Sequence, residues 1–104
     1  MGELLGQLSE KWESFEVLHF PKGFRSREPN GECMIMMDAD LAGCISSAMK
    51  GRLDDRRRAI LHSRIARLGA ILPLIREDEN ASNYFTLLHE TAMLAAEIDD
   101  ARRA

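Results

Sequence analysis

The side chains that could bind a transition metal are two cysteines and three histidines: Cys33, Cys44, His19, His62 and His89. No two of them stand at a CxxC or HxxxH spacing, so a single helical turn would not hold two ligands together. A four-ligand site would have to be assembled wholly by the tertiary fold. We therefore predict no metal and no cofactor, and we interpret both cysteines as small core residues. One pair of cysteines also does not make the disulfide framework of a small secreted protein.

The hydroxyl, thiol and carboxyl groups that could take part in catalysis lack the local motifs of catalytic sites. Ser46 and Ser47 follow Cys44 within a predicted helix, with no glycine elbow or oxyanion loop beside them. Asp38 and Asp40 fall on different helix faces, and helix capping explains them. The seven glycines are scattered and form no phosphate loop. We predict that the protein is not an enzyme, although a triad of Cys44 or a serine with a histidine remains an alternative, because triads are assembled in space.

The strongest basic signal is the run Arg56–Arg58, with further arginines before and after it. The KGRLDD connection at 50–55 resembles the turn of a helix-turn-helix. These arginines point in several directions, however, and Asp54 and Asp55 occupy the helix start that would meet DNA bases. The overall pI of about 5.6 also disfavours a nucleic-acid binder, which is usually basic. A DNA-binding regulator using the Arg-rich helix 54–76 is therefore the alternative function.

The net charge of −3 conceals three blocks of opposite sign. Residues 1–49 carry 4 basic and 8 acidic groups (−4), residues 50–76 carry 8 and 2 (+6), and residues 77–104 carry 2 and 7 (−5). The simplest interpretation is internal. A basic helix flanked by acidic helices gives complementary charges across helix pairs.

The longest helical pattern covers residues 54–76, and we predict it to be the central helix. Asp54 and Asp55 can cap its first turn, and Pro73 should bend it at Gly69, the residue whose carbonyl the proline ring meets. The side chains on its two faces differ in size. The bulky stripe is Leu61, Ile65, Leu68, Leu72 and Ile75, and the small ridge is Ala59, His62, Ala66, Gly69 and Pro73. A second helix could approach the small ridge, so this helix is expected to be covered from both sides.

Three further helices are predicted at about 3–18, 39–50 and 81–101. The first repeats large apolar residues at spacings of three and four. The second would be capped by Asp38 or Asp40. The composition supports helices, because aromatic residues make up only 6% of the chain while leucine, isoleucine, alanine and methionine supply most of the apolar volume.

The connection after the first helix is expected to be a long loop over 19–32, broken by prolines and glycines. Phe20 and Phe24 should pin this loop to the body, and Trp12 is interpreted as a core anchor. The run 33–37 is predicted to be a helix start or an extended lead-in, with a short strand as the alternative.

Two predictions concern the last helix and its ends. Asn80 or Ser82 is expected to cap its first turn. The tail 99–104, DDARRA, is expected to fray.

A protein partner is the remaining function class. Arg64 lies beside the bulky stripe, where it reaches the helix edge, pairs with a neighbouring glutamate, or anchors an interface. The small ridges that carry His62 and His89 either pack on each other or form a two-fold interface between two copies. The candidate partner-binding residues are Arg56, Arg64, Arg67, His62, Ala66, Phe85 and His89.

We thus predict an all-α fold, a small helical bundle of about four helices in a single helical domain, 1–104. No stretch is long and apolar enough to span a membrane, and the first residues lack the basic region of a signal peptide, so the protein is expected to be cytoplasmic. The predicted function is association with another protein or with a second copy, as an adaptor, inhibitor or immunity-type protein. Nucleic acid and membrane are not expected partners.

Overall fold

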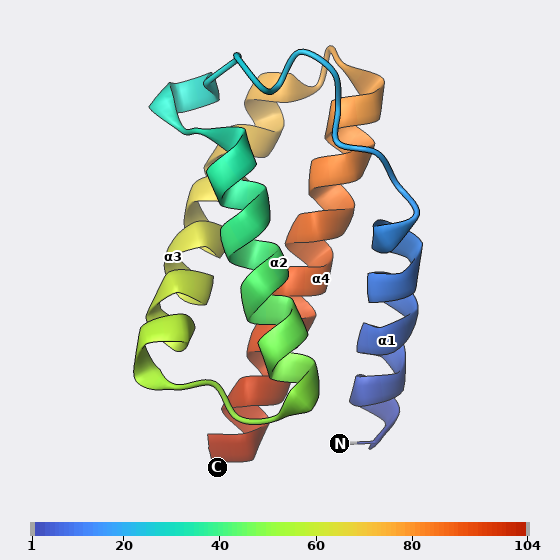
Figure 1. Ribbon diagram of the computed structural model, residues 1–104, viewed down its shortest axis with the longest axis vertical. Helices are drawn as coiled ribbons and strands as arrows, with labels where there is room; N and C mark the ends of the chain where they lie inside the picture. Colours follow the sequence, from blue (N-terminus) through green and yellow to red (C-terminus); the bar gives the residue numbers. More distant parts are fainter. Residues whose placement is uncertain (1, 104) are drawn as a thin grey trace.

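A computed structural model describes residues 2–103, shown in Figure 1. These residues form four α-helices and no strand: α1 is Gly2–Glu16, α2 is Met34–Lys50, α3 is Asp55–Ile71 and α4 is Glu79–Arg103. Two short 3-10 segments are η1 at Pro29–Gly31, in the connection from α1 to α2, and η2 at Leu72–Ile75. The predicted all-α bundle of about four helices is confirmed.

The central helix is α4. It packs against α1, α2 and α3, and in Figure 1 it lies behind α2 with α1 and α3 to either side. Eleven residues of α4 are buried, against three of α3. The prediction that helix 54–76 is covered on both faces is wrong within this chain, because Ala59, His62 and Ala66 are exposed. The alanines of α4 let neighbouring helices approach from several sides, whereas the five arginines of α3 keep one of its faces in water.

The end of α3 follows from its proline. Asp54 caps its first turn as predicted, since the side chain accepts a hydrogen bond from the Arg57 N–H at 2.7 Å. Pro73 has no N–H to donate to the Gly69 carbonyl. The α-helix therefore ends at Ile71 and the chain tightens into η2. The predicted single bent α-helix over 54–76 is wrong in this respect, because its last turn is not α-helical.

The starts of two helices differ from the predictions. α2 begins at Met34, five residues earlier than predicted, with Cys33 at its N-cap. Asp38 and Asp40 therefore lie inside the helix and cap nothing. Residues 34–37 are helical, so the strand alternative for this run is wrong. At α4 the capping residue is Asp78, whose side chain accepts a hydrogen bond from the Ala81 N–H at 3.0 Å. The predicted caps, Asn80 and Ser82, are wrong, because both residues lie within the helix.

Aromatic side chains pin the segment between α1 and α2 to the bundle, as predicted. Phe24 is only 2% exposed and its ring lies 5.7 Å from that of Phe85, centroid to centroid. Phe20 packs edge-on against both Tyr84 and Phe85. Trp12 is partly buried and stacks near Phe15 in α1. This cluster joins the first connection to the N-terminal half of α4.

The predicted charge complementarity across helix pairs is confirmed. Arg64 of α3 pairs with Asp40 of α2, with 2.9 Å between Nε and Oδ2. Arg58 of α3 pairs with Asp100 of α4 at 3.0 Å. Two of the five arginines of α3 are thus engaged by acidic groups of the helices beside it.

The last turn of α4 does not fray, contrary to the prediction for the tail. Asp99 is fully buried and accepts a hydrogen bond from the Leu53 N–H at 2.8 Å. Arg103 binds the same carboxylate through Nε at 2.9 Å and donates to the Leu53 carbonyl at 2.6 Å, while Arg102 donates to the carbonyl of Ala48. We call Asp99, Arg103 and Leu53 the C-terminal latch. It holds the end of α4 on the turn between α2 and α3, and that anchoring outweighs the fraying usual at an exposed terminus.

Candidate functional site

The three arginines predicted to bind a partner differ in whether they already form ion pairs within the chain. Arg64 is half-buried and paired with a carboxylate, although this belongs to Asp40 and not to a glutamate as predicted. Arg67 lies 3.7 Å from a carboxylate oxygen of Glu32. Arg56 is exposed, and no ion pair joins it to another of the residues 2–103.

The two histidine ridges meet in part: Gly69 of the α3 ridge packs on His89, whereas Ala59, His62 and Ala66 are exposed. His89 is half-buried between α4 and α3, where its Nε2 lies 3.1 Å from the Ile65 carbonyl oxygen. A Cβ at Gly69 would lie 3.2 Å from the same nitrogen, so the absence of a side chain at Gly69 makes room for the ring. His62 points outward and is exposed, beside Ala66 on the bare face of α3. The structure therefore places His89 inside the bundle and His62 on its surface.

Phe85 and Cys44 belong to the interior. Phe85 is 0% exposed and forms part of the aromatic cluster, so it does not lie on the surface that a partner would meet. Cys44 is buried, and its thiol lies 3.5 Å from the Arg57 carbonyl oxygen. Burial raises the pKa of the Cys44 thiol, which keeps it protonated at neutral pH and makes it a poor nucleophile. Cys33 and Cys44 are both free, and residues 2–103 hold no cluster of three side chains fit to bind a metal ion.

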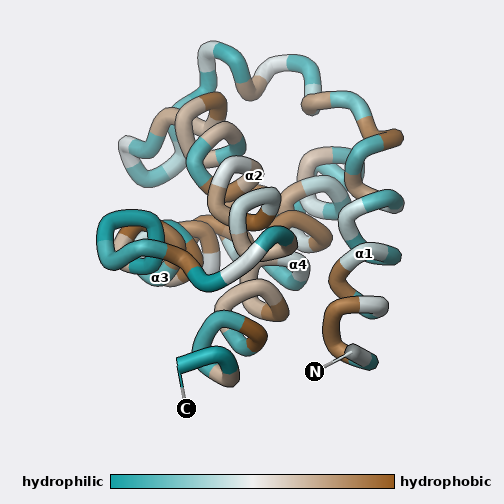
Figure 2. The backbone as a smooth tube through the Cα atoms, turned by 60° about the horizontal axis from the view of Figure 1, so that its bottom comes forward, coloured by the Kyte–Doolittle hydropathy of each residue, from teal (hydrophilic) through white to brown (hydrophobic). Residues whose placement is uncertain are grey.

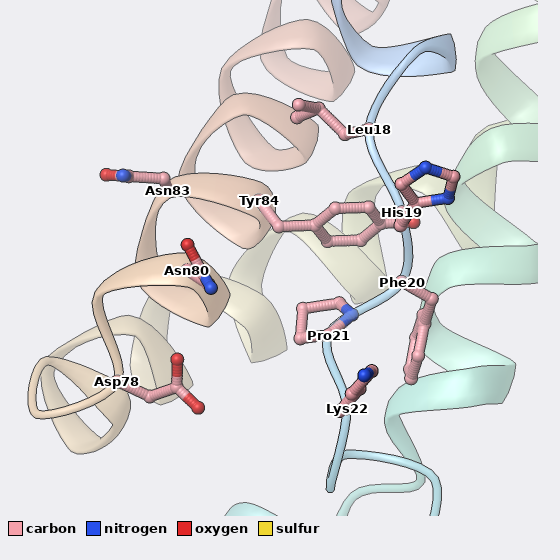
Figure 3. Close-up of a pocket in the computed structure, with 9 residues that line it drawn as sticks. All are labelled: Leu18, His19, Phe20, Pro21, Lys22, Asp78, Asn80, Asn83 and Tyr84. Atoms are coloured by element: carbon pink, nitrogen blue, oxygen red, sulfur yellow. The ribbon is translucent and has the colours of Figure 1, made fainter.

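A pocket of about 630 Å³ lies between the segment 18–22 and the first turns of α4 (Figure 3). Its apolar wall includes Pro21 and the ring of Tyr84. The Tyr84 hydroxyl already donates to Asp38 Oδ1 at 2.9 Å, beneath the pocket. The other polar side chains of the lining are mostly exposed: His19, Lys22, Asn80 and Asn83. Its volume suits a small ligand, but these solvated groups define no particular ligand chemistry.

The outer face of α2 is the surface that the sequence reasoning missed. We define it as Ile35, Met36, Ala39, Gly43 and Ser46, which lie opposite the side that packs on α3 and α4. Ile35 is 40% exposed and Met36 is 57% exposed. None of these five side chains is ionisable, and the two aspartates of α2 turn toward Tyr84 and Arg64. The exposed Lys50, four residues after Ser46, continues the same stripe at the end of α2. In Figure 2, α2 is mainly pale to brown, whereas α3 shows long teal stretches.

A signal for this face was present in the sequence. The five residues recur at spacings of one, three and four, which places them on one helical stripe. Starting the helix at residue 39 removed Ile35 and Met36 from the pattern, and the stripe was then too small to notice.

A shallow hollow of about 270 Å³ borders the outer face of α2 on the side of α3. Ala39, Gly43 and Ser47 line it from α2, and Arg57 and Ile60 line it from α3. The hollow exists because the α2 side chains at this place are small. The outer face is therefore a low ridge of small residues with two large apolar side chains at one end and a depression along one edge.

Comparison with known proteins gives no relative for this chain: no protein-family model, no curated protein and no solved structure matches it. Within residues 2–103, none of the helices combines the length and apolar character that crossing a membrane requires. The fold and the site define a class, a small four-helix protein with an exposed helix face of small and apolar residues that ends at Lys50. What that class does here has to be argued from the geometry.

Proposed function

We propose that this chain acts by binding another protein through the outer face of α2, without catalysis. The observation that carries the proposal is an exposed apolar end, Ile35 and Met36, that continues into small residues and meets a charged side chain at Lys50, at the far end of α2. Interfaces are depleted of charged residues at their centre and enriched in methionine. The roles that suit such a chain are those of an adaptor, an inhibitor or an immunity-type protein.

The outer face of α2 is a better binding surface than the exposed face of α3, which consists of Arg56, His62, Ala66 and Arg67. That face has the small residues of a contact surface, but its arginines would stay hydrated or need an acidic partner. The same arginines give less support to DNA binding, since Arg57, Arg58 and Arg64 are each paired with a carboxylate of this chain. A phosphate backbone would have to compete with those carboxylates.

The proposal also places the chain in the cytoplasm. Both cysteines are free in the structure, and a reducing compartment keeps free thiols in that state. No role in binding a cofactor is proposed.

A capture experiment with two matched methionine variants tests the proposed surface. Met36 on α2 and Met93 on α4 are 57% and 50% exposed, so a glutamate at either position remains in water and leaves the core intact. Tagged wild-type protein and the Met36→Glu and Met93→Glu variants would be used to retain proteins from the native cell extract.

The expected result is that the wild type and Met93→Glu retain the same protein and that Met36→Glu loses it. Burying an unpaired carboxylate in the interface costs Met36→Glu its affinity. Equal retention by all three forms would show that binding uses another surface. Retention of nothing by the wild type, with no association of the chain with itself, would refute the proposed function.

A further inference from the structure

The segment that joins α1 to α2 makes its backbone hydrogen bonds within itself. We call residues 18–32 the strap, which crosses one end of the bundle in Figure 1. Its internal hydrogen bonds include those from the N–H of Phe24 to Pro21, of Arg27 to Gly23 and of Glu32 to Pro29. Among the described residues, no backbone hydrogen bond joins 19–32 to α2, α3 or α4. The strap can therefore leave these helices without breaking their backbone hydrogen bonds.

Side chains hold the strap on the bundle. Pro21, Phe24 and Pro29 are buried, whereas most of the other strap side chains are exposed. Arg27 also forms an ion pair with Glu77 at 2.7 Å, but an ion pair between exposed side chains contributes little. Segments with few buried contacts and exposed backbone hydrogen bonds open at a lower free energy than the core does. The strap has both of these properties.

The pocket described above lies where the strap meets α4. Leu18, Phe20 and Pro21 line it from the strap, and Tyr84 lines it from α4 (Figure 3). The space of about 630 Å³ between them shows that the strap is not packed against α4 along its whole length. The Tyr84 hydroxyl donates to Asp38 of α2, so this polar group keeps its partner within the bundle when the strap moves.

We propose that the strap is the movable wall of this pocket: it leaves α4 and returns to it as one unit while the four helices stay packed. The pocket has no lining residue from α2, so it is separate from the outer face of that helix. Departure of the strap uncovers Tyr84 and also Phe85, whose ring packs against Phe20 and Phe24 in the closed form. The pocket then becomes an open groove with two aromatic rings at its base. Burial of those rings drives the strap back, because it removes apolar surface from water.

Hydrogen exchange of the native protein, measured by NMR, tests whether the strap opens by itself. The amides of Arg27 and Glu32 report on the strap, since both donate hydrogen bonds within it, and the amide of Leu88 reports on the middle of α4. Both strap amides are expected to exchange at least about tenfold faster than that of Leu88. Their protection factors should equal each other, because one opening event exposes both.

Two mild variants separate opening of the strap from unfolding of the bundle. Ile98 is fully buried near the C-terminal end of α4, and that end of the bundle lies opposite the strap in Figure 1. Ile98→Val should speed exchange at Leu88 about fivefold and leave Arg27 and Glu32 unchanged. Phe24→Leu should speed exchange at both strap amides about fivefold. It should also speed exchange at Leu88, because unfolding breaks the contacts of Phe24 too.

Nitration of Tyr84 tests whether the strap covers the pocket. Tyr84 is the only tyrosine of the chain and is 6% exposed, so tetranitromethane is expected to reach its ring mainly when the strap is open. Phe24→Leu should raise the nitration rate about fivefold, in step with its effect on exchange in the strap. Ile98→Val should leave the nitration rate unchanged.

Three results overturn the inference. If Ile98→Val speeds exchange in the strap as much as at Leu88, the strap opens only when the bundle unfolds. If Phe24→Leu speeds exchange at only one of the two strap amides, the strap does not move as one unit. If nitration of Tyr84 does not respond to Phe24→Leu, the strap is not the wall that covers this ring. Strap amides that exchange as fast as those of an unstructured peptide overturn it as well, because the strap then has no closed form.

Discussion

Replacing Asp99 with asparagine is expected to destabilise the protein strongly while leaving its shape almost unchanged. Asp99 has no exposed surface, and its carboxylate accepts hydrogen bonds from the Leu53 N–H at 2.8 Å and from Arg103 Nε at 2.9 Å. Arg58 Nε lies 3.6 Å from the same carboxylate. An asparagine of equal size can keep the bond from Leu53, but it leaves the two guanidinium groups without their common negative charge.

The magnitude follows from burial. Removing one partner of a fully buried ion pair costs about 3–5 kcal/mol. The Arg103 and Arg58 side chains are 18% and 41% exposed, so water recovers part of that cost and about 2–4 kcal/mol is expected. For a domain of this size the melting temperature should fall by roughly 10–30 °C.

The assay is urea and thermal unfolding of the wild type, Asp99→Asn and a control, Asp100→Asn. Asp100 is the neighbouring residue and also pairs with Arg58, at 3.0 Å, but its side chain is 52% exposed. Its loss should cost no more than about 1 kcal/mol. If the two variants differ by less than about 1 kcal/mol, the reasoning that gives the C-terminal latch its importance is refuted.

The pH dependence of the same variant has a definite sign. Burial raises the pKa of Asp99, but the hydrogen bond from Leu53 and the charges of Arg103 and Arg58 together bring the pKa below its ordinary value. A carboxyl whose pKa is lower in the folded state stabilises the fold above about pH 4 and loses this contribution as the pH falls further. The difference in free energy of unfolding between the wild type and Asp99→Asn should therefore become smaller below about pH 4.

Two further predictions concern single helix positions. Burial raises the pKa of Asp38, and the hydrogen bond from Tyr84 offsets only part of the rise. The wild type therefore loses stability as the pH rises from about 4 through the pKa of Asp38 in the folded protein. The Asp38→Asn variant keeps an acceptor for Tyr84 and carries no charge. Its melting temperature should be higher than that of the wild type at pH 7 but not in acid. In dilute protein, Gly43→Ala should gain about 0.5–1 kcal/mol, whereas Gly69→Ala should gain less because its methyl group displaces His89. Equal gains in urea unfolding would contradict the packing described for Gly69.

The features that were predictable from the sequence are local. Asp54 was one of the two predicted caps because the residues that it serves follow it directly. The effect of Pro73 was predicted only in part: a bend was expected, and the missing N–H ends the α-helix instead. The pairing of basic and acidic helices was visible in the block pattern of charge. Hydrophobic periodicity was sufficient to count the helices, since each one has a strong apolar stripe.

The features that were missed depend on distant neighbours. Asp99 and Leu53 are separated by 46 residues, so no local pattern announces that the tail is held. The centrality of α4 was missed because alanine fits a helix surface as well as a helix contact. The prediction capped α2 with Asp38 or Asp40, because aspartate is a common cap and cysteine is not. The predicted helix therefore left out Ile35 and Met36, which lie on its exposed face. The candidate site was therefore lost through one helix boundary, the least reliable part of such a prediction.

The position of α4 in the bundle has a consequence for biosynthesis. This helix is translated after the three helices that pack on it, so α1, α2 and α3 emerge from the ribosome before the surface that they need exists. Their apolar stripes stay exposed during that interval, which is when a nascent chain is most prone to aggregate or to engage a chaperone. The latch contacts of Asp99 and Arg103 become available only after α1, α2 and α3 have all been made.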